Sequence, residues 1–265
     1  MPVHPTAVVE EGARIDPGAT VGPFALIDAR VRIGAGTVVG AGAVIAGETT
    51  IGARSWIGPH AVLGTPPQIR ETLEAGALEV GDGTVIRELA TVHAARPGGR
   101  TRVGSSCLLM AGCHVAHDCQ LADHVELANG VQLAGHVEVE RGACLGGLAA
   151  VHQFARIGAF AFVGAGAMVS QDVPPYCLAS GDRARIYGLN VVGLRRNGIA
   201  PARRRELARA VKLLFAAASL GDGLARVSAE VAASEERDHL LAFVSASRRG
   251  LCRGVLGARR GGEEG

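Results

Sequence analysis

A six-residue repeat of aliphatic side chains runs through most of this chain. Val, Ile or Leu recurs at every sixth position from Val3 to Leu63, again from Val80 to Val92, and again from Val103 to Val169. A hexapeptide period is the sequence sign of a parallel β-helix. An α-helix would instead need apolar residues at spacings of three and four, which this region lacks. The repeat therefore predicts an all-β solenoid, in which the period tells us which residues stack on one another.

A second mark of the repeat is a small residue, usually Ala, four positions after each aliphatic one. Cys107, Cys113 and Cys119 occupy this position in consecutive hexads. One large and one small inward side chain per hexad would fill a narrow prism. The chain has six cysteines but no CxxC pair. We therefore interpret them as reduced core residues, and not as disulfide or metal ligands.

Composition excludes several classes of function. The chain has 265 residues, of which only 3% are aromatic, and a net charge of +2. A solenoid stacks locally and needs no aromatic core. No basic run is interleaved with aromatic residues, which argues against nucleic-acid binding. No leader-like segment precedes the repeat, and no apolar run reaches the ~18–20 residues that a membrane span needs. We expect a cytoplasmic protein with no membrane span.

The repeat and its breaks predict the domain organisation. We expect the β-helix over residues 1–176, ended by Pro174 and Pro175, which cannot continue a hydrogen-bonded ladder. Two loops, 64–79 and 96–102, interrupt it. A connector over 177–200 should lead to a helical domain over 201–256, whose first helix starts at Pro201 and breaks at the glycines of 221–223. The tail, 257–265, should be disordered.

The repeat also predicts that several histidines stack in one column. Three hexads make one triangular coil, so residues 18 apart lie on adjacent coils, with strands ~4.8 Å apart. The hexads that begin at Val115, Leu133 and Val151 then carry His117, His136 and His152 at outward or corner positions. Counting back in the same register, both loops leave the prism from this column. We expect His114 beside it, at the preceding corner.

A stacked histidine set bordered by two loops indicates a functional site, and two chemistries remain open. Acid–base catalysis is favoured, with Asp118 either orienting His117 or standing as a solvated turn carboxylate. A metal site is the alternative, because His114 and His117 are closely spaced and His136 is within reach. No carboxylate obviously completes a ligand set.

Several longer motifs resemble one enzyme family over nearly the whole chain. They are Leu108–Leu109–Met110, the run His114 to Cys119, the run Leu133 to Val137, the run Ala150 to Phe154, the run Gln171 to Tyr176, the run Asn190 to Arg196, and the C-terminal Ser247 to Leu251. In this order they resemble the UDP-N-acetylglucosamine O-acyltransferases of lipid A biosynthesis. The resemblance implies a homotrimer of left-handed parallel β-helices, each with a C-terminal helical domain and with active sites between neighbouring subunits.

The resemblance also implies the reaction and the residue roles. The family transfers a 3-hydroxyacyl group from acyl carrier protein to the glucosamine 3-hydroxyl of a UDP-sugar, with no metal or redox cofactor. By motif, His117 would be the general base and the Gly135 amide would face the thioester oxyanion. The side chains that would hold sugar, phosphate or pantetheine are His114, His136, His152 and Gln153. Asn190 and Arg196 would contact the nucleotide.

The first loop departs from the family pattern. The family's Gln-Asp-Leu-Lys-Tyr is best matched by Gln68–Ile69–Arg70–Glu71, so the Asp is missing and Arg70 stands in for the Lys. Arg and Lys are not equivalent as donors. We therefore expect either weaker UDP-GlcNAc binding or a preference for a modified acceptor such as the 3-amino sugar. Ala165 falls where the family's acyl-chain ruler lies, so a long acyl chain could fit.

Other functions are compatible with the hexapeptide repeat alone. They are an N-acyltransferase acting on a 3-amino UDP-sugar, an acetyl-CoA-dependent acetyltransferase, a metal-dependent carbonic anhydrase-like enzyme, and a non-catalytic trimeric scaffold. The helical C-terminus and the run Gln171 to Tyr176 favour the O-acyltransferase.

Overall fold

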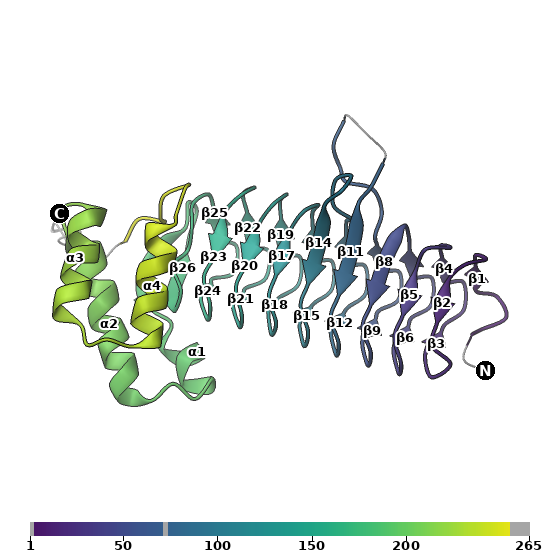
Figure 1. Ribbon diagram of the computed structural model, residues 1–265, viewed down its shortest axis with the longest axis horizontal. Helices are drawn as coiled ribbons and strands as arrows, with labels where there is room; N and C mark the ends of the chain where they lie inside the picture. Colours follow the sequence, from purple (N-terminus) through teal and green to yellow (C-terminus); the bar gives the residue numbers. More distant parts are fainter. Residues whose placement is uncertain (1–2, 71–73, 255–265) are drawn as a thin grey trace, which may run out of the picture.

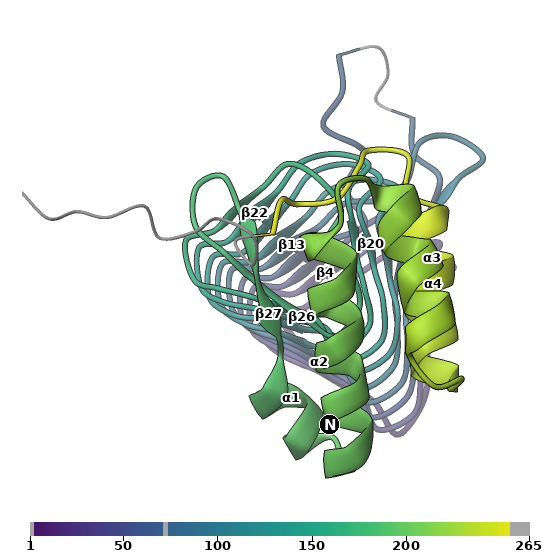
Figure 2. The ribbon, with the colours of Figure 1, turned by 90° about the vertical axis from the view of Figure 1, so that its left-hand side faces the viewer.

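The computed structural model describes residues 3–70 and 74–254, and it confirms the predicted β-helix (Figure 1). Very short parallel strands alternate with turns, and each strand pairs with the strands of the coils before and after it. The result is a long triangular prism with three flat sheets, visible end-on in Figure 2. The register is 18 residues per coil on either side of the loops, as in Val115 beside Leu133 and Leu133 beside Val151, and it shortens to 16 residues at the end, where Val163 lies beside Ala179.

We name the three sheets by their first strands. Sheet I contains β1 (Val8–Val9), β4 (Leu26–Ile27), β7 (Val44–Ile45), β10 (Val62–Leu63), β13 (Thr91–Val92), β16 (His114–Val115), β19 (Gln132–Leu133), β22 (Ala150–Val151) and β25 (Met168–Val169). Sheet II contains β2 (Arg14–Ile15), β5 (Arg32–Ile33), β8 (Glu48–Ile51), β11 (Ala77–Val80), β14 (Arg100–Val103), β17 (Gln120–Leu121), β20 (Glu138–Val139) and β23 (Arg156–Ile157). Sheet III contains β3 (Thr20–Val21), β6 (Val38–Val39), β9 (Trp56–Ile57), β12 (Val85–Ile86), β15 (Leu108–Leu109), β18 (Glu126–Leu127), β21 (Cys144–Leu145), β24 (Phe162–Val163), β26 (Cys177–Ser180) and β27 (Arg185–Leu189).

The prism interior is built as the repeat predicts. The second residue of each two-residue strand points inward and is almost fully buried from Val21 onward, and the small partner four positions on is buried as well. The first coil differs: Val9 is 36% exposed and Ala7 is only partly buried. These two positions do not follow the predicted burial, because the first coil has a neighbouring coil on one side only.

The three stacked cysteines lie in the core, in agreement with their interpretation as small inward residues. Cys107, Cys113 and Cys119 are buried and free. Burial raises the pKa of the Cys107 thiol to about 11 and that of Cys119 to about 12, so neither is a thiolate near neutral pH. Polar residues in the same inward position bond to backbone carbonyls, as Thr37 does to Gly52 at 2.7 Å.

The end of the solenoid differs from the prediction. Beyond Pro174 and Pro175 the ladder continues, because β26 pairs in parallel with β24. β27 then pairs with β26 in the antiparallel direction and ends sheet III. The expected connector thus contains these two strands and a short helix, α1 (Val191–Arg196).

Three longer helices pack across the end of the prism (Figures 1 and 2). They are α2 (Pro201–Ala216), α3 (Leu220–Glu230) and α4 (Glu235–Ser245). The predicted break at residues 221–223 is wrong: those residues form the first turn of α3, which Ser219 caps by accepting a hydrogen bond from the Asp222 amide at 3.1 Å. The expected disordered tail lies outside the described residues. Among the described helices, none is long and apolar enough to cross a membrane.

Candidate active site

The loops and the stacked histidines meet at one edge of the prism. This edge joins sheet I to sheet II, and we call it the I/II corner. Both interruptions leave the coil here, one between β10 and β11 and the other between β13 and β14, and the first projects clearly in Figure 1. The turns after β16, β19 and β22 carry His117, His136 and His152 at the same corner. The predicted column is therefore confirmed.

His117 and Asp118 form a hydrogen-bonded pair at this corner. The Nδ1 atom of His117 lies 2.7 Å from Oδ2 of Asp118, and both side chains are 14% exposed. The Asp118 amide donates to Thr101 Oγ1 at 2.8 Å, which fixes the turn. The His117 ring lies directly over the backbone of Gly135 on the next coil, where a Cβ atom would come within 2.7 Å of the imidazole.

His136 lies one residue further along the next turn, over Asp118. Its Nε2 atom is 3.7 Å from Asp118 Oδ2, and its ring makes an edge contact with His117, the centroids 5.2 Å apart. On its other side it stacks on Phe154, with centroids 4.6 Å apart and planes 12° from parallel. Asp118, His136 and Phe154 all have left-handed backbone conformations, with φ of 61°, 59° and 63°. The same turn geometry thus repeats on successive coils and stacks these side chains.

Arg96 from the second loop closes over this group. Its Nη2 atom lies 2.7 Å from His136 Nε2, and its Nε atom lies 3.4 Å from Asp118 Oδ2. Sequence reasoning missed Arg96 as a site residue, because a loop outside the repeat has no predictable register. The position of the loop in the histidine column was the available signal.

The protonation states follow from these contacts. Burial alone raises the pKa of Asp118, but hydrogen bonds from the His117 ring and the Arg96 amide outweigh it, so the pKa falls below its usual value and the carboxylate is ionised. Partial burial lowers the pKa of His136, and Arg96 and His117 lower it further, against an opposing effect of Asp118. Asp118 is therefore an anion between imidazoles near neutral pH.

His114 lies elsewhere than predicted. It is on strand β16 of sheet I, not at a corner, because it is the outward residue that precedes the inward Val115. Its Nδ1 atom is 2.9 Å from Thr91 Oγ1, and its ring makes an edge contact with the buried His93. Burial, with smaller effects of His93 and His117, lowers the pKa of His114. His93 in turn holds the base of the first loop, with its Nδ1 atom 2.7 Å from the Pro66 carbonyl oxygen.

The other predicted residues of this corner point to solvent. His152 and Gln153 are exposed in the turn after β22, where the His152 ring contacts the Gln153 carbonyl oxygen at 3.1 Å. Gln68 and Arg70 are exposed in the first loop. Phe154, half exposed in that same turn, was not predicted.

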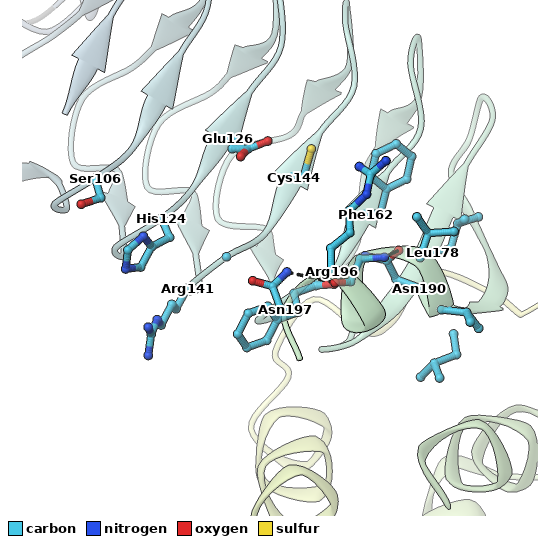
Figure 3. Close-up of a pocket in the computed structure, with 16 residues that line it drawn as sticks. Ser106, His124, Glu126, Arg141, Cys144, Phe162, Leu178, Asn190, Arg196 and Asn197 are labelled. Atoms are coloured by element: carbon cyan, nitrogen blue, oxygen red, sulfur yellow. Dashed lines mark hydrogen bonds between the residues drawn. The ribbon is translucent and has the colours of Figure 1, made fainter. Parts of the chain in front are cut away.

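Asn190 and Arg196 lie on a different face of the same chain. They line a pocket of about 1010 Å³ on sheet III and its edge with sheet II, the II/III corner, drawn in Figure 3. Asn190 is 8% exposed: its side chain caps α1 by accepting from the Gly193 amide at 3.0 Å, and it donates to the Phe160 carbonyl at 2.9 Å. Arg196 is exposed at the end of α1. None of the I/II-corner histidines lines this pocket.

Comparison with known proteins identifies the family. Residues 172–252 match the model of "Udp N-acetylglucosamine O-acyltransferase; Domain 2", and residues 6–41 and 30–65 match the bacterial transferase hexapeptide repeat. The acyl-[acyl-carrier-protein]–UDP-N-acetylglucosamine O-acyltransferase of Anaeromyxobacter sp. (strain K) is 45% identical over 96% of this chain and 100% of its own length. The corresponding protein of Myxococcus xanthus is 46% identical over 95% of this chain and 99% of its own.

Solved structures agree with this assignment. The UDP-N-acetylglucosamine acyltransferase from Campylobacter jejuni superposes with a TM-score of 0.90 at 35% identity, over 95% of this chain and 99% of that one. LpxA from Acinetobacter baumannii superposes with a TM-score of 0.92 at 32% identity, over 96% and 100% of the two chains. The handedness of the β-helix fits these relatives. The chain belongs to the acyl-[acyl-carrier-protein]–UDP-N-acetylglucosamine O-acyltransferase family.

Proposed function

We propose that this protein transfers a 3-hydroxyacyl group from acyl carrier protein to the 3-hydroxyl of UDP-GlcNAc, the first step of lipid A biosynthesis. Its relatives carry the name of this reaction, and they match the chain over nearly its full length. The observation that carries the chemistry is the pair of His117 and Asp118, 2.7 Å apart, at a corner bordered by both loops.

His117 serves as the general base. The ionised Asp118 accepts a hydrogen bond from the Nδ1–H group of His117, so the lone pair of the ring is on Nε2. Nε2 takes the proton of the sugar hydroxyl as its oxygen attacks the thioester carbon. The C–S bond then breaks, and His117 returns the proton to the departing thiolate. The products are the sugar ester and the free pantetheine thiol. Such acid–base assistance contributes roughly 10²–10⁴-fold in rate.

The Gly135 amide stabilises the oxyanion of this reaction. Its N–H donates to no group in the described part of the chain, so it is available to a ligand. The His117 ring lies against the Cα of Gly135, which puts base and donor on adjacent coils. A backbone N–H aimed at the developing negative charge is worth up to roughly 10²–10³-fold.

The distribution of side chains on the three outer faces supports a trimer. The outward strand residues of sheet II are mostly charged: Arg14, Arg32, Glu48, Glu79, Arg100, Arg102, Glu138 and Arg156. Those of sheets I and III are mostly apolar or uncharged: Val8, Leu26, Val44, Val62, Ala150 and Met168 on sheet I, and Val38, Trp56, Val85, Leu108, Cys144 and Phe162 on sheet III. Two different apolar faces can close a heterologous ring, with sheet I of one subunit packed on sheet III of the next.

Such a ring completes the active site. If sheet II of every subunit faces solvent, the I/II corner of one subunit lies beside the II/III corner of its neighbour. The histidine turns follow β16, β19 and β22, and the pocket with Asn190 and Arg196 extends along β18, β21 and β24 of the same three coils. The neighbour's Arg196 and the rim of Asn190 then hold the nucleotide, while His114, His136, His152 and Gln153 hold sugar, phosphate or pantetheine. Gln68 and Arg70 reach the acceptor from the first loop.

A metal-dependent reaction is the less favoured alternative. His117, Asp118 and His136 are close enough to hold a metal ion, with one potential ligand atom of each within 4.8 Å of the others. However, the Arg96 guanidinium already contacts both Asp118 and His136. A fixed cation there repels a second one and uses the same lone pairs, which favours acid–base chemistry.

The test is an acyl-transfer assay with 3-hydroxyacyl carrier protein, UDP-GlcNAc and its 3-amino analogue, read by mass spectrometry. His117→Ala should lower turnover about 10²–10⁴-fold, while the unfolding free energy changes by only about 0.5 kcal/mol. His4→Ala, which removes an exposed histidine from the far end of the prism, is the matched control. Wild-type turnover by His117→Ala with every donor would refute the role of His117 as the general base. Activity on the 3-amino analogue alone would show that this sugar, and not UDP-GlcNAc, is the acceptor.

A further inference from the structure

The second loop brings a permanent cation to the base of the proposed reaction. Arg96 contacts Asp118 twice, through its backbone amide and its Nε atom, both 3.4 Å from Oδ2. The same guanidinium reaches His136 Nε2 at 2.7 Å. Thr101, on strand β14 directly after this loop, accepts a hydrogen bond from the Asp118 amide. One short segment thus contacts both neighbours of His117 without touching His117 itself.

The contact with His136 fixes the state of that imidazole. Arginine carries only donors and stays charged at every accessible pH. A guanidinium at 2.7 Å therefore requires an Nε2 atom with no proton, so His136 is neutral and carries its proton on Nδ1. A protonated His136 would place two cations in contact beside Asp118.

We propose that Arg96 is a positioning residue for the base: it keeps His136 neutral and partly compensates the charge of Asp118, the anion that faces His117. This inference rests on the proposed role of His117. Without Arg96, the full charge of Asp118 would stabilise protonated His117, and His136 could also become protonated. The base would then be available only at higher pH.

The surroundings of this group are few enough for a clear test. The titratable and charged side chains that interact with it come from three consecutive coils: His93, Arg96, His114, His117, Asp118 and His136. Among these six described residues, Asp118 is the acidic one and Arg96 is the one charged at all pH values. The Arg96 side chain is 51% exposed, so its replacement should leave the fold intact.

The experiment compares the pH dependence of kcat/KM for the full-length protein and for Arg96→Gln. The acid limb of this profile should move to higher pH by about 0.5–1 unit in Arg96→Gln. The value of kcat/KM should therefore fall roughly three- to tenfold at pH values below the limb and recover at pH values above it. Arg96→Lys keeps the charge and should restore most of the profile. Arg100→Gln removes the same charge from an arginine paired with Glu79 on sheet II, at 3.2 Å, and should not shift it.

Two kinetic outcomes would overturn the proposal. If kcat/KM of Arg96→Gln fell by the same factor at every pH, and the fall came only from a higher KM for one substrate, Arg96 would be a substrate-binding residue. An unchanged profile would show that its contacts have no effect on the base.

A second measurement does not depend on turnover. Nitrogen-15 NMR of the histidine rings should find His136 of the unmodified protein neutral, with its proton on Nδ1, and a mixture of states in Arg96→Gln. A proton on Nε2 of His136 in the unmodified protein would overturn the proposal. Absence of acyl transfer by the unmodified protein would instead refute the proposed function, and the NMR result would still decide the role of Arg96.

Discussion

Gly135 shows how closely this site depends on a single missing methyl group. A Cβ atom there would lie 2.7 Å from Cε1 and 2.8 Å from Nε2 of His117, too close for either group to stay in place. The ring is the far end of a side chain, so it would move while the prism remains intact.

We therefore predict that Gly135→Ala lowers acyl transfer at least about 10-fold by displacing the base, with little loss of stability. Gly147 occupies the same turn position on another corner, where a Cβ would lie 3.4 Å from the nearest atom, the Asn129 carbonyl oxygen, which is an ordinary contact. Gly147→Ala is the control. Steady-state rates and thermal unfolding of the two variants make the comparison. Full activity of Gly135→Ala would mean that the imidazole need not lie against this backbone.

The residues at the site also show what the sequence could predict. The period placed His117, His136 and His152 in one column, because a repeat that fills a prism leaves no freedom of register. It placed His114 at a corner, whereas His114 is the outward residue of strand β16. The hexapeptide period alone does not distinguish an outward strand residue from a corner residue. Arg96 was missed because its loop lies outside the period. Asn190 and Arg196 came only from family motifs, because both lie beyond the last hexad of the repeat.

Among the elements, one buried carboxylate contributes several of the hydrogen bonds between the C-terminal segment and the end of the solenoid. Asp172 is 1% exposed and follows the last coil. It accepts hydrogen bonds from the Arg156 amide at 2.9 Å and from the Ser247 hydroxyl at 2.7 Å, and its carbonyl accepts from the Cys252 amide at 2.9 Å. The period did not predict the contacts with Ser247 and Cys252, since these residues are 75 or more positions away from Asp172 in sequence.

We predict that Asp172→Ala destabilises the protein by about 2–4 kcal/mol, because two partly buried donors lose their buried acceptor. Asp123 makes a similar turn contact, to the Ser105 amide at 2.8 Å, but it is exposed. Asp123→Ala should cost no more than about 1 kcal/mol. Urea unfolding followed by circular dichroism would measure both. Equal losses of unfolding free energy in the two variants would show that the burial of Asp172 adds nothing to the strength of its hydrogen bonds.

At the scale of the whole molecule, the two halves of the proposed site lie on different edges of one prism. The histidines are at the I/II corner, and the pocket with Asn190 and Arg196 is at the II/III corner and on sheet III. One chain cannot bring them together, because sheet II separates the two corners. In the proposed trimer the site is therefore complete only between neighbouring subunits, and this division can be tested by mixing subunits.

We predict that His117→Ala and Arg196→Ala, each strongly impaired alone, restore activity when they assemble together. Every mixed trimer has one interface at which the intact His117 of one subunit meets the intact Arg196 of the next. Random assembly from equal amounts should therefore recover about a quarter of the wild-type sites over all trimers, and about a third of them in the isolated mixed trimers. Co-expression with two affinity tags isolates the mixed trimers, and acyl transfer is compared with that of each parent. The control is a trimer in which every subunit carries both substitutions, so that no interface has an intact pair. Mixed trimers no more active than their parents would mean that both residues serve the same subunit's site, or that sheets I and III are not the faces in contact.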